Sequence, residues 1–195
     1  KLKSGKVFEV PAHKLSKEDN EFIGSLAKPD RVSFEKIIER DGVTYLKSSN
    51  LPFTGKSYAL HPNGQKYFEV NYKDGKKNGL FVSWDENGKK SSERNLKDGK
   101  KEGLEVFWHE NGQKSIEGNY KDGKEDGLMV EWYKNGQKCI EYNYEDGKPV
   151  GLCVDWHENG QKKWEANCKE GKPVKGSEKF WNSKGESVDT IEEAE

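Results

Sequence analysis

The sequence has few hydrophobic residues and no long apolar run. Hydrophobic residues make up 31% of the 195 residues, a smaller share than a compact domain with a single core normally has. No stretch approaches the roughly 18 to 20 consecutive apolar residues that a membrane-spanning helix needs. The composition therefore argues against a transmembrane segment and against a fold built around one thick core.

An excess of charge of one sign is also missing. The chain has 34 Lys and Arg against 35 Asp and Glu, which gives a formal net charge of -1. Domains that bind nucleic acid by neutralising phosphates usually carry a clear basic excess. We therefore do not expect a nucleic acid as partner.

Cysteine is scarce, and sequence motifs of catalysis are lacking. Cys139, Cys153 and Cys168 show neither CxxC spacing nor nearby His pairs, so we interpret them as small residues that fill repeat positions. No glycine-rich loop between a strand and a helix is available to hold phosphates, and no nucleophile motif surrounds a Ser or Cys. We predict no catalytic residue, no metal and no cofactor, and we do not expect an enzyme.

Aromatic residues and glycines, in contrast, are plentiful. The chain contains six Trp, eight Tyr, eight Phe and 21 Gly, and disordered chains have few aromatics, so we expect this chain to fold. The glycines recur every 24 residues, which is the mark of a repeat protein. Asn-Gly pairs begin at Asn63, Asn87, Asn111, Asn135 and Asn159. A second series follows Asp or Glu, at Gly75, Gly99, Gly123, Gly147 and Gly171, and a third consists of Gly55, Gly79, Gly103, Gly127 and Gly151.

The repeating unit is close to G-L-x-V-x-W-x-E-N-G-Q-K-x-I-E-x-N-Y-x-D-G-K-x-x and occurs five times between Gly55 and Val174. A sixth, degenerate unit begins at Gly176 and keeps Trp181 and Gly185. Each unit has two short runs of alternating character bounded by Asn-Gly and Asp-Gly, which predicts a β-hairpin. The predicted fold is all-β: an elongated single-layer antiparallel sheet of repeated hairpins.

Four regions follow from this pattern. Residues 1–40 form an N-terminal capping segment, 41–54 a lead-in strand and loop, 55–190 the array of about six hairpins, and 191–195 an acidic tail. Within the capping segment, Ser16 is placed to cap a short helix through about Ala27, and Ser33 to cap a further turn or two through Glu39. The cap would cover the otherwise bare first edge of the sheet.

The register of each hairpin determines which residues share a face. A two-residue loop would set Val106 opposite Glu117, whereas a three-residue loop with Gly112 as a bulge would set Val106 opposite Ile116. We predict the second register, because it gives one apolar and one polar face. The apolar face of the third unit would then carry Leu104, Val106, Trp108, Ile116 and Tyr120, and the opposite face the recurring Glu69, Glu93, Glu117, Glu141 and Glu165 and the recurring Asn71, Asn95, Asn119, Asn143 and Asn167.

Two further patterns could suggest chemistry. His109-Glu110 and His157-Glu158 resemble metal-ligand pairs, but adjacent residues on a strand point to opposite faces and cannot chelate together. The column of glutamates resembles paired carboxylates, but a spacing of about 10 Å from hairpin to hairpin leaves each one separately solvated. We interpret both patterns as structural.

The tryptophans form a ladder that we expect to be mainly structural: Trp84, Trp108, Trp132, Trp156 and Trp181. On the face opposite to this ladder, the positions of the first strand differ in every unit. Because selective recognition requires variety, we predict that a protein partner reads this face. The candidate contact residues are Phe81, Phe107, Met129, Glu105, Glu131 and Tyr133.

These residues also carry a family resemblance. The pattern G-L-x-V-x-W-H-E-N-G-Q-K followed by Y-K-D-G-K resembles the variant MORN repeat of bacterial YwqK-family antitoxins, and Asp41 to Tyr45 with Pro52 to Gly55 resembles the lead-in of that family's array. The resemblance spans about residues 36 to 188. It implies an elongated array of hairpins that binds another protein, which in the family's namesake case is a toxin.

We therefore expect a scaffold for macromolecular recognition, possessing no enzyme activity, of an antitoxin or immunity type. The alternative is a cell-surface or envelope module that binds a glycan, a choline-like ligand or an anionic lipid through its aromatic hairpins. Peripheral membrane contact through the column Lys66, Lys90, Lys114, Lys138 and Lys162 is less favoured, because the matched acidic residues dilute its field. The chain begins at Lys1 rather than Met, which leaves two localisations open, the cytoplasm or export after removal of a leader.

Overall fold

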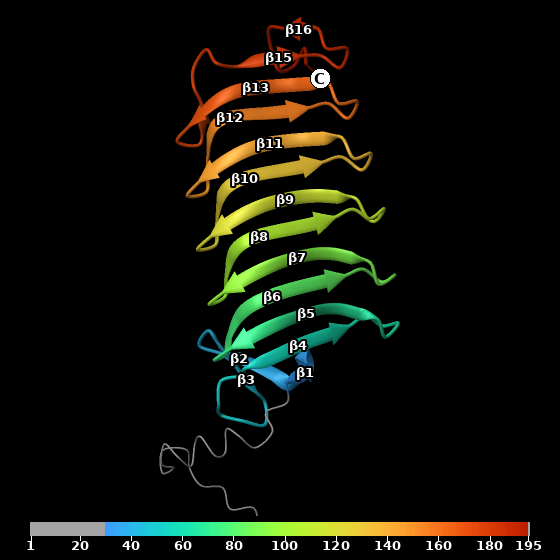
Figure 1. Ribbon diagram of the computed structural model, residues 1–195, viewed down its shortest axis with the longest axis vertical. Coiled ribbons are helices and arrows are strands. Elements are labelled where there is room, and N and C mark those ends of the chain that lie inside the picture. The colour runs from blue at the N-terminus through green and yellow to red at the C-terminus, as the bar shows by residue number, and fades with distance from the viewer. Residues whose placement is uncertain (1–29, 195) are drawn as a thin grey trace, which may run out of the picture.

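The computed structural model describes residues 30–194, and nearly all of them form one long antiparallel sheet of hairpins (Figure 1). The prediction of an all-β, single-layer hairpin array is confirmed. In these described residues the sheet has 14 strands, and from β4 to β13 each strand pairs with its neighbours in sequence. A separate two-stranded sheet, β2 with β3, lies near the N-terminal end of the array. The helix predicted from Ser16 lies outside the described residues.

The strands of the array have nearly constant length. They are β4 (Gly55–Leu60), β5 (Lys66–Lys73), β6 (Lys76–Trp84), β7 (Lys90–Lys97), β8 (Lys100–Trp108), β9 (Lys114–Lys121), β10 (Lys124–Trp132), β11 (Lys138–Glu145), β12 (Lys148–Trp156) and β13 (Lys162–Lys169). Shorter strands precede and follow them: β1 (Arg31–Ser33), β2 (Ile37–Arg40), β3 (Val43–Leu46), β14 (Lys172–Pro173), β15 (Lys179–Trp181) and β16 (Ser187–Val188).

The Asn-Gly turns lie along one long edge of the sheet, on the right in Figure 1. In the third unit the Gly112 N–H donates to the His109 carbonyl and the His109 N–H donates to the Gln113 carbonyl, both at 2.8 Å. Gly112 has φ 86°, in the left-handed region that glycine adopts without strain. This is the three-residue loop with a glycine bulge that the sequence predicts.

The Asp-Gly turns lie along the other edge and connect successive hairpins. Asp122 and Gly123 have φ of 51° and 89°, and Lys121 pairs with Lys124 across them. Two consecutive positive φ values identify a type I′ turn, whose twist matches that of the flanking strands. The Gly123 N–H also donates to the Lys101 carbonyl of the preceding hairpin, at 2.9 Å, so each turn is attached to its neighbour.

The predicted register is wrong beyond the first pair after each turn. Trp108 pairs with Lys114 as a three-residue loop requires, but Phe107 then pairs with Ile116, and Val106 with Glu117. Ser115 is an extra residue on β9, that is, a second bulge. A one-residue shift moves every later side chain of the strand to the other face, and the same shift occurs in each hairpin from β4 to β13.

The face assignments change accordingly. The Glu and Asn columns share a face with the Leu, Val and Trp columns, not the face opposite to them. Ile116 and Tyr120 lie opposite Phe107 and Gly103, so they belong with the variable first-strand positions. The physical reason is that the bulge adds one residue to the second strand only, which leaves the alternation of the first strand unchanged.

The N-terminal cap buries the principal hydrophobic cluster of the described residues. We use the term cap for residues 30–54, which include the lead-in. Val32, Ile37 and Phe53 of the cap pack with Val70 and Tyr72 of β5. β1 pairs in parallel with β4, and the Thr44 N–H donates to the Gly75 carbonyl at 2.8 Å. The cap thus covers the face of the first hairpin that carries the variable positions.

The helix predicted from Ser33 through Glu39 is wrong. A single 3-10 turn spans Phe34–Lys36, and the Ser33 side chain makes no capping hydrogen bond. Ile37 then begins β2, which pairs with β3. β-branched residues such as Ile37 and Ile38 favour a strand, and the cross-strand partners supplied by β3 stabilise the extended conformation.

Candidate protein-binding surface

The array has two faces of different character. We call the uniform face the one formed by the columns of Leu, Val and Trp on the first strands and of Lys, Glu and Asn on the second strands. We call the variable face the other one, which carries Phe81, Ser83, Glu105, Phe107, Met129, Glu131, Cys153 and Asp155 on the first strands. These assignments follow from the observed pairings.

On the uniform face, four lysines of the column each approach a Trp ring of the next hairpin. The Lys90 ammonium lies 5.9 Å from the ring centroid of Trp108 in the following hairpin and 2.5 Å from a Glu93 carboxylate oxygen of its own strand. The bulge places Lys and Glu three residues apart on one face, which regular alternation would not allow. The same Lys–Glu pair recurs in every hairpin: Lys66–Glu69, Lys90–Glu93, Lys114–Glu117, Lys138–Glu141 and Lys162–Glu165.

The side chain that follows the first strand also contacts the next hairpin in four of the five units, whereas Asp85 of the second unit accepts hydrogen bonds from the backbone of its own turn. His109 Nε2 lies 2.8 Å from the Trp132 carbonyl oxygen, and the Tyr133 hydroxyl donates to the Trp156 carbonyl at 2.7 Å. His61 and His157 make the same contact with Trp84 and Trp181. These histidines therefore stabilise the stack, and within residues 30–194 no group of three or more His, Cys, Asp or Glu is arranged to hold a metal ion.

The variable face has a different interaction in each hairpin. Between β6 and β8, the Arg94 guanidinium lies over the Phe81 ring at 4.4 Å and within 6.0 Å of the Phe107 ring centroid. The Glu105 side chain is 2% exposed and accepts hydrogen bonds from Arg94 at 2.9 Å and from Lys101 at 2.6 Å. This ion-pair cluster occurs once, because no other unit has an Arg at the position of Arg94 or a Glu at the position of Glu105, although Lys77 is equivalent to Lys101.

Further along the variable face, on β10 to β13, the side chains are mainly acidic and aromatic. The Tyr142 hydroxyl donates to Asp155 at 2.8 Å, and the Tyr142 ring lies 6.2 Å from Trp164. Burial raises the pKa of the Asp155 carboxyl, although the Tyr142 hydrogen bond and the Lys163 charge oppose the shift. Burial, together with the charge of Asp155, also raises the pKa of Glu131.

The structure distributes the six candidate contact residues unevenly. Phe81, Phe107, Met129 and Glu131 are half-buried on the variable face and leave part of their side chains accessible. Glu105 lies on the same face, but it is buried beneath its two cationic partners. Tyr133 follows a Trp at the Asn-Gly edge, and its hydroxyl is used between hairpins. Sequence reasoning missed Arg94, Tyr142 and Trp164, which lie on the second strands and appear on this face only because of the bulge.

The cysteines also lie where packing explains them. Cys153 and Cys168 are buried on adjacent strands of one hairpin, and Cys139 is half-buried. Burial, together with a hydrogen bond to Cys168, raises the pKa of the Cys153 thiol to about 12. A thiol that stays protonated at neutral pH is a weak nucleophile.

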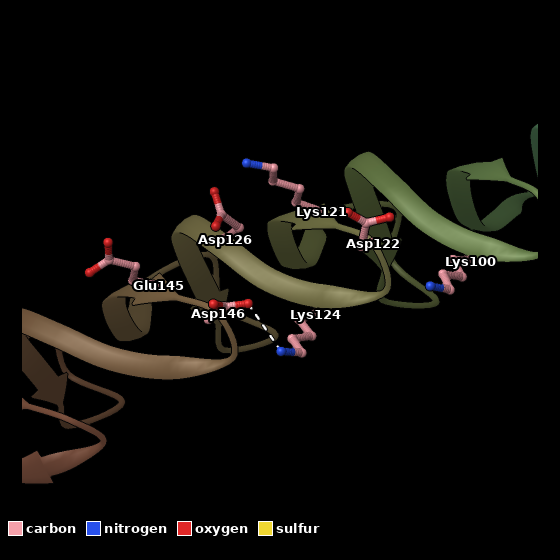
Figure 2. Close-up of a pocket in the computed structure, with 7 residues that line it drawn as sticks. All are labelled: Lys100, Lys121, Asp122, Lys124, Asp126, Glu145 and Asp146. Carbon is pink, nitrogen blue, oxygen red and sulfur yellow. Dashed lines mark hydrogen bonds and ion pairs between the residues drawn. The ribbon is translucent and has the colours of Figure 1, made fainter.

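A hollow of about 570 Å³ lies at the edge formed by the Asp-Gly turns (Figure 2). Its lining is charged, and the seven side chains drawn in Figure 2 come from three successive turns. Lys124 and Asp146 form an ion pair at 3.0 Å across two of these turns. Hydrogen bonding to Lys124 lowers the pKa of the Asp146 carboxyl. Because both side chains are well exposed, we interpret the hollow as a solvated gap between turns.

Comparison with known proteins identifies the repeat. Residues 53–74, 77–98, 101–122 and 125–146 each match the family model described as MORN repeat variant. The comparison with curated proteins gave no match. Among solved structures, the chain is similar to one in the crystal structure of a GtfA/B complex bound to UDP and GlcNAc, with 12% identity and a TM-score of 0.23, over 68% of this chain and 23% of that chain. The four repeat matches are thus the finding that bears on the fold. In the described residues, no helix is long and apolar enough to cross a membrane.

Proposed function

We propose that this chain is a scaffold without enzyme activity that recognises another protein through its variable face. MORN repeats in four consecutive units support a repeat scaffold for binding. The observation that carries the choice of face is the contrast between the two surfaces. Side chains on the uniform face repeat one set of mutual contacts, whereas Phe81, Arg94, Phe107 and Met129 make contacts that change from hairpin to hairpin.

The residue types on the variable face suit a protein partner. Arginine and aromatic side chains dominate the energetically important contacts of protein interfaces: aromatic rings bury a large area at little entropic cost, and arginine combines an apolar stem with several hydrogen-bond donors. Phe107 and Met129 are half-buried, so a partner would complete their burial. A toxin-like protein is the partner class that we favour, in line with the resemblance to YwqK-family antitoxins.

A choline-like ligand held between tryptophans is less favoured. A quaternary ammonium would need open aromatic rings. The rings of Trp84, Trp108, Trp156 and Trp181 each already have a lysine ammonium of this chain within 5.1 to 5.9 Å of their centroids. The charge balance of the uniform face likewise argues against an anionic membrane, because a glutamate pairs with each lysine of the column.

Site-specific photo-crosslinking tests the proposal. The full chain would carry a benzophenone amino acid in place of Phe107, or in place of Leu104 as the matched control on the uniform face. In extracts of the source cells, we expect a discrete protein adduct from position 107 and none from position 104. Excess wild-type protein should suppress the adduct, whereas an excess of the folded triple variant Phe81→Ser, Phe107→Ser, Met129→Ser should not. An adduct from position 104 alone would show that the uniform face is the recognition surface.

A further inference from the structure

The charge on the variable face is divided between its two halves. Towards β8, Arg94 and Lys101 both pair with Glu105, so two cations meet one anion. From β10 to β13 the balance reverses, with Glu125, Glu131 and Asp155 against Lys163. We call this second region the acidic aromatic patch and define it by Glu125, Glu131, Asp155, Tyr142, Tyr144 and Trp164.

The register brings these side chains together. Glu131 pairs with Ile140, which pairs with Asp155, which pairs with Trp164. The four residues therefore form one row across β10, β11, β12 and β13. Tyr142 and Tyr144 lie beside this row on the same face of β11, with ring centroids 6.3 Å apart in a stacked arrangement. Two carboxylates, on β10 and β12, thus lie near three aromatic rings on β11 and β13.

The local electrostatics favour an additional cation at this patch. Glu131 and Asp155 are partly withdrawn from water, and each has the other as a like-charged neighbour. Burial and, after it, the charge of Glu125 raise the pKa of the Tyr144 hydroxyl, so a third negative charge acts on the same region. Lys163 supplies attraction to Asp155, but the three carboxylates exceed that single charge. A further positive charge would therefore be attracted here.

The aromatic rings fit a particular form of cation. The Arg and Lys side chains have apolar stems that lie along rings and charged heads that reach carboxylates. This face already binds an arginine in that way, since Arg94 lies over Phe81 and pairs with Glu105. The acidic aromatic patch offers the same two elements, rings next to carboxylates.

At the N-terminal end of the array, the variable face is covered by another part of the chain. The cap lies on it at the first hairpin, where Phe34 contacts Phe68 with ring centroids 5.3 Å apart and Phe53 contacts Tyr72 at 5.6 Å. The cluster under the cap ends at Phe81 and Leu96. The acidic aromatic patch lies on the same face, beyond the part that the cap covers. The cap covers its part of the face with apolar side chains, whereas the patch also carries carboxylates.

We propose, on the premise that the variable face is the recognition surface, that the acidic aromatic patch receives a basic segment of the protein partner. Arg or Lys side chains of that segment lie on the Tyr142, Tyr144 and Trp164 rings. Their charged heads reach Glu131 and Asp155. The region around Arg94 then contacts a different, less basic part of the partner.

Peptide binding to the full chain tests this inference. The probe is a fluorescein-labelled peptide of alternating Arg and Gly, followed by fluorescence anisotropy at an ionic strength of about 0.15 M, where distant charges are screened. The double variant Glu131→Gln, Asp155→Asn removes two charges from the patch. The matched control Glu117→Gln, Glu141→Gln removes two charges from the uniform face. Far-UV circular dichroism verifies the folding of both.

We expect the patch variant to bind the peptide about tenfold more weakly than wild type and the control to remain within about twofold. Replacing Arg by Glu in the peptide should abolish binding. Equal weakening by both variants, or no binding to wild type, would overturn the inference. These outcomes are separate from the crosslinking result: an adduct from position 107 with a negative peptide result overturns the basic segment alone, whereas the absence of that adduct overturns the choice of face.

Discussion

The two faces of one sheet follow different rules, although the same 24-residue unit produces both. On the uniform face, each Lys pairs with a Glu of its own strand, and most of these lysines also approach the next Trp ring. On the variable face, the Arg94–Glu105–Lys101 cluster and the Tyr142–Asp155 pair each occur once. The comparison teaches that the repeated residues maintain the stack, while the residues that depart from the repeat are available for recognition.

The sharpest test of this comparison uses two neighbouring aromatic residues that point to opposite faces. Trp108→Ala should lower the free energy of unfolding by about 3 kcal/mol, because it removes a large half-buried ring that Lys90 of the preceding hairpin approaches. Phe107→Ala should lower it by about half as much, because a half-buried phenyl ring buries less apolar area than an indole ring. Urea titrations monitored by circular dichroism would measure both. Equal losses would show that the variable face contributes as much to stability as the uniform face does.

A second pair of variants compares two glutamates. Glu105→Gln should lower the free energy of unfolding by about 2 kcal/mol, because it removes a buried carboxylate that compensates Arg94 and Lys101. Glu117→Gln should cost about 0.5 kcal/mol, since the Lys114–Glu117 pair is largely solvated. The same urea titrations apply. The interpretation of Glu105 as a structural anchor would be contradicted if Glu105→Gln kept full stability.

A third comparison concerns the reactivity of two cysteines, Cys139 on β11 and Cys153 on β12. At pH 8.5, Cys139 should react with iodoacetamide at least about tenfold faster than Cys153, because alkylation requires the thiolate. The pKa of Cys153 is raised to about 12, so this thiol stays protonated in the native protein. Mass spectrometry of tryptic peptides would follow the two sites. In urea the difference should disappear, and fast native labelling of Cys153 would show that β12 and β13 open readily.

The smallest expected effect concerns Glu131. Its native pKa is raised by burial and by Asp155, so the folded chain holds that proton more tightly than the unfolded chain. Its contribution to stability is complete below the unfolded carboxyl pKa and is lost as pH rises through the native pKa. Glu131→Gln should therefore stabilise the protein at pH 7 by about 0.5 kcal/mol or less, since solvent screens a half-exposed group, and by nothing near pH 4. Thermal unfolding at the two pH values would measure this, and destabilisation at pH 7 would indicate an attractive partner for Glu131.

The sequence predicts the repeat, the hairpins and both turns, because Asn-Gly and Asp-Gly encode local backbone conformations that depend on few neighbours. It does not predict the second bulge. The bulged positions hold Tyr67, Ser91, Ser115, Cys139 and Lys163, which share no side-chain property, so nothing at the site itself marks it. The effect of the bulge is seen only when the strands are paired: it brings each Glu to the face that carries its Lys and the Trp column.

The same limit explains the errors in the candidate surface. Ile116 and Tyr120 were predicted on the Trp face because the register was wrong by one residue. Glu105 has the appearance of an accessible charge in the sequence, and its burial depends on Arg94, across the strand pair, and on Lys101. The packing of the cap on the variable face depends on Phe53 and Tyr72, which are 19 residues apart. Contacts of this kind are set by the tertiary arrangement, whereas period and turn type are set locally.

The exclusive pairing of neighbouring strands from β4 to β13 has a kinetic consequence. Contacts between residues close in sequence close only short loops, so their entropic cost is small and folding is fast for a β-protein. Any hairpin of the array can form first and serve as a template for the next, so folding can proceed outward in both directions. The cap is the exception, because β1 pairs with β4 across an intervening hairpin. We therefore expect the cap, whose residues leave the ribosome first, to pack only after β4 and β5 have formed the hairpin that it covers.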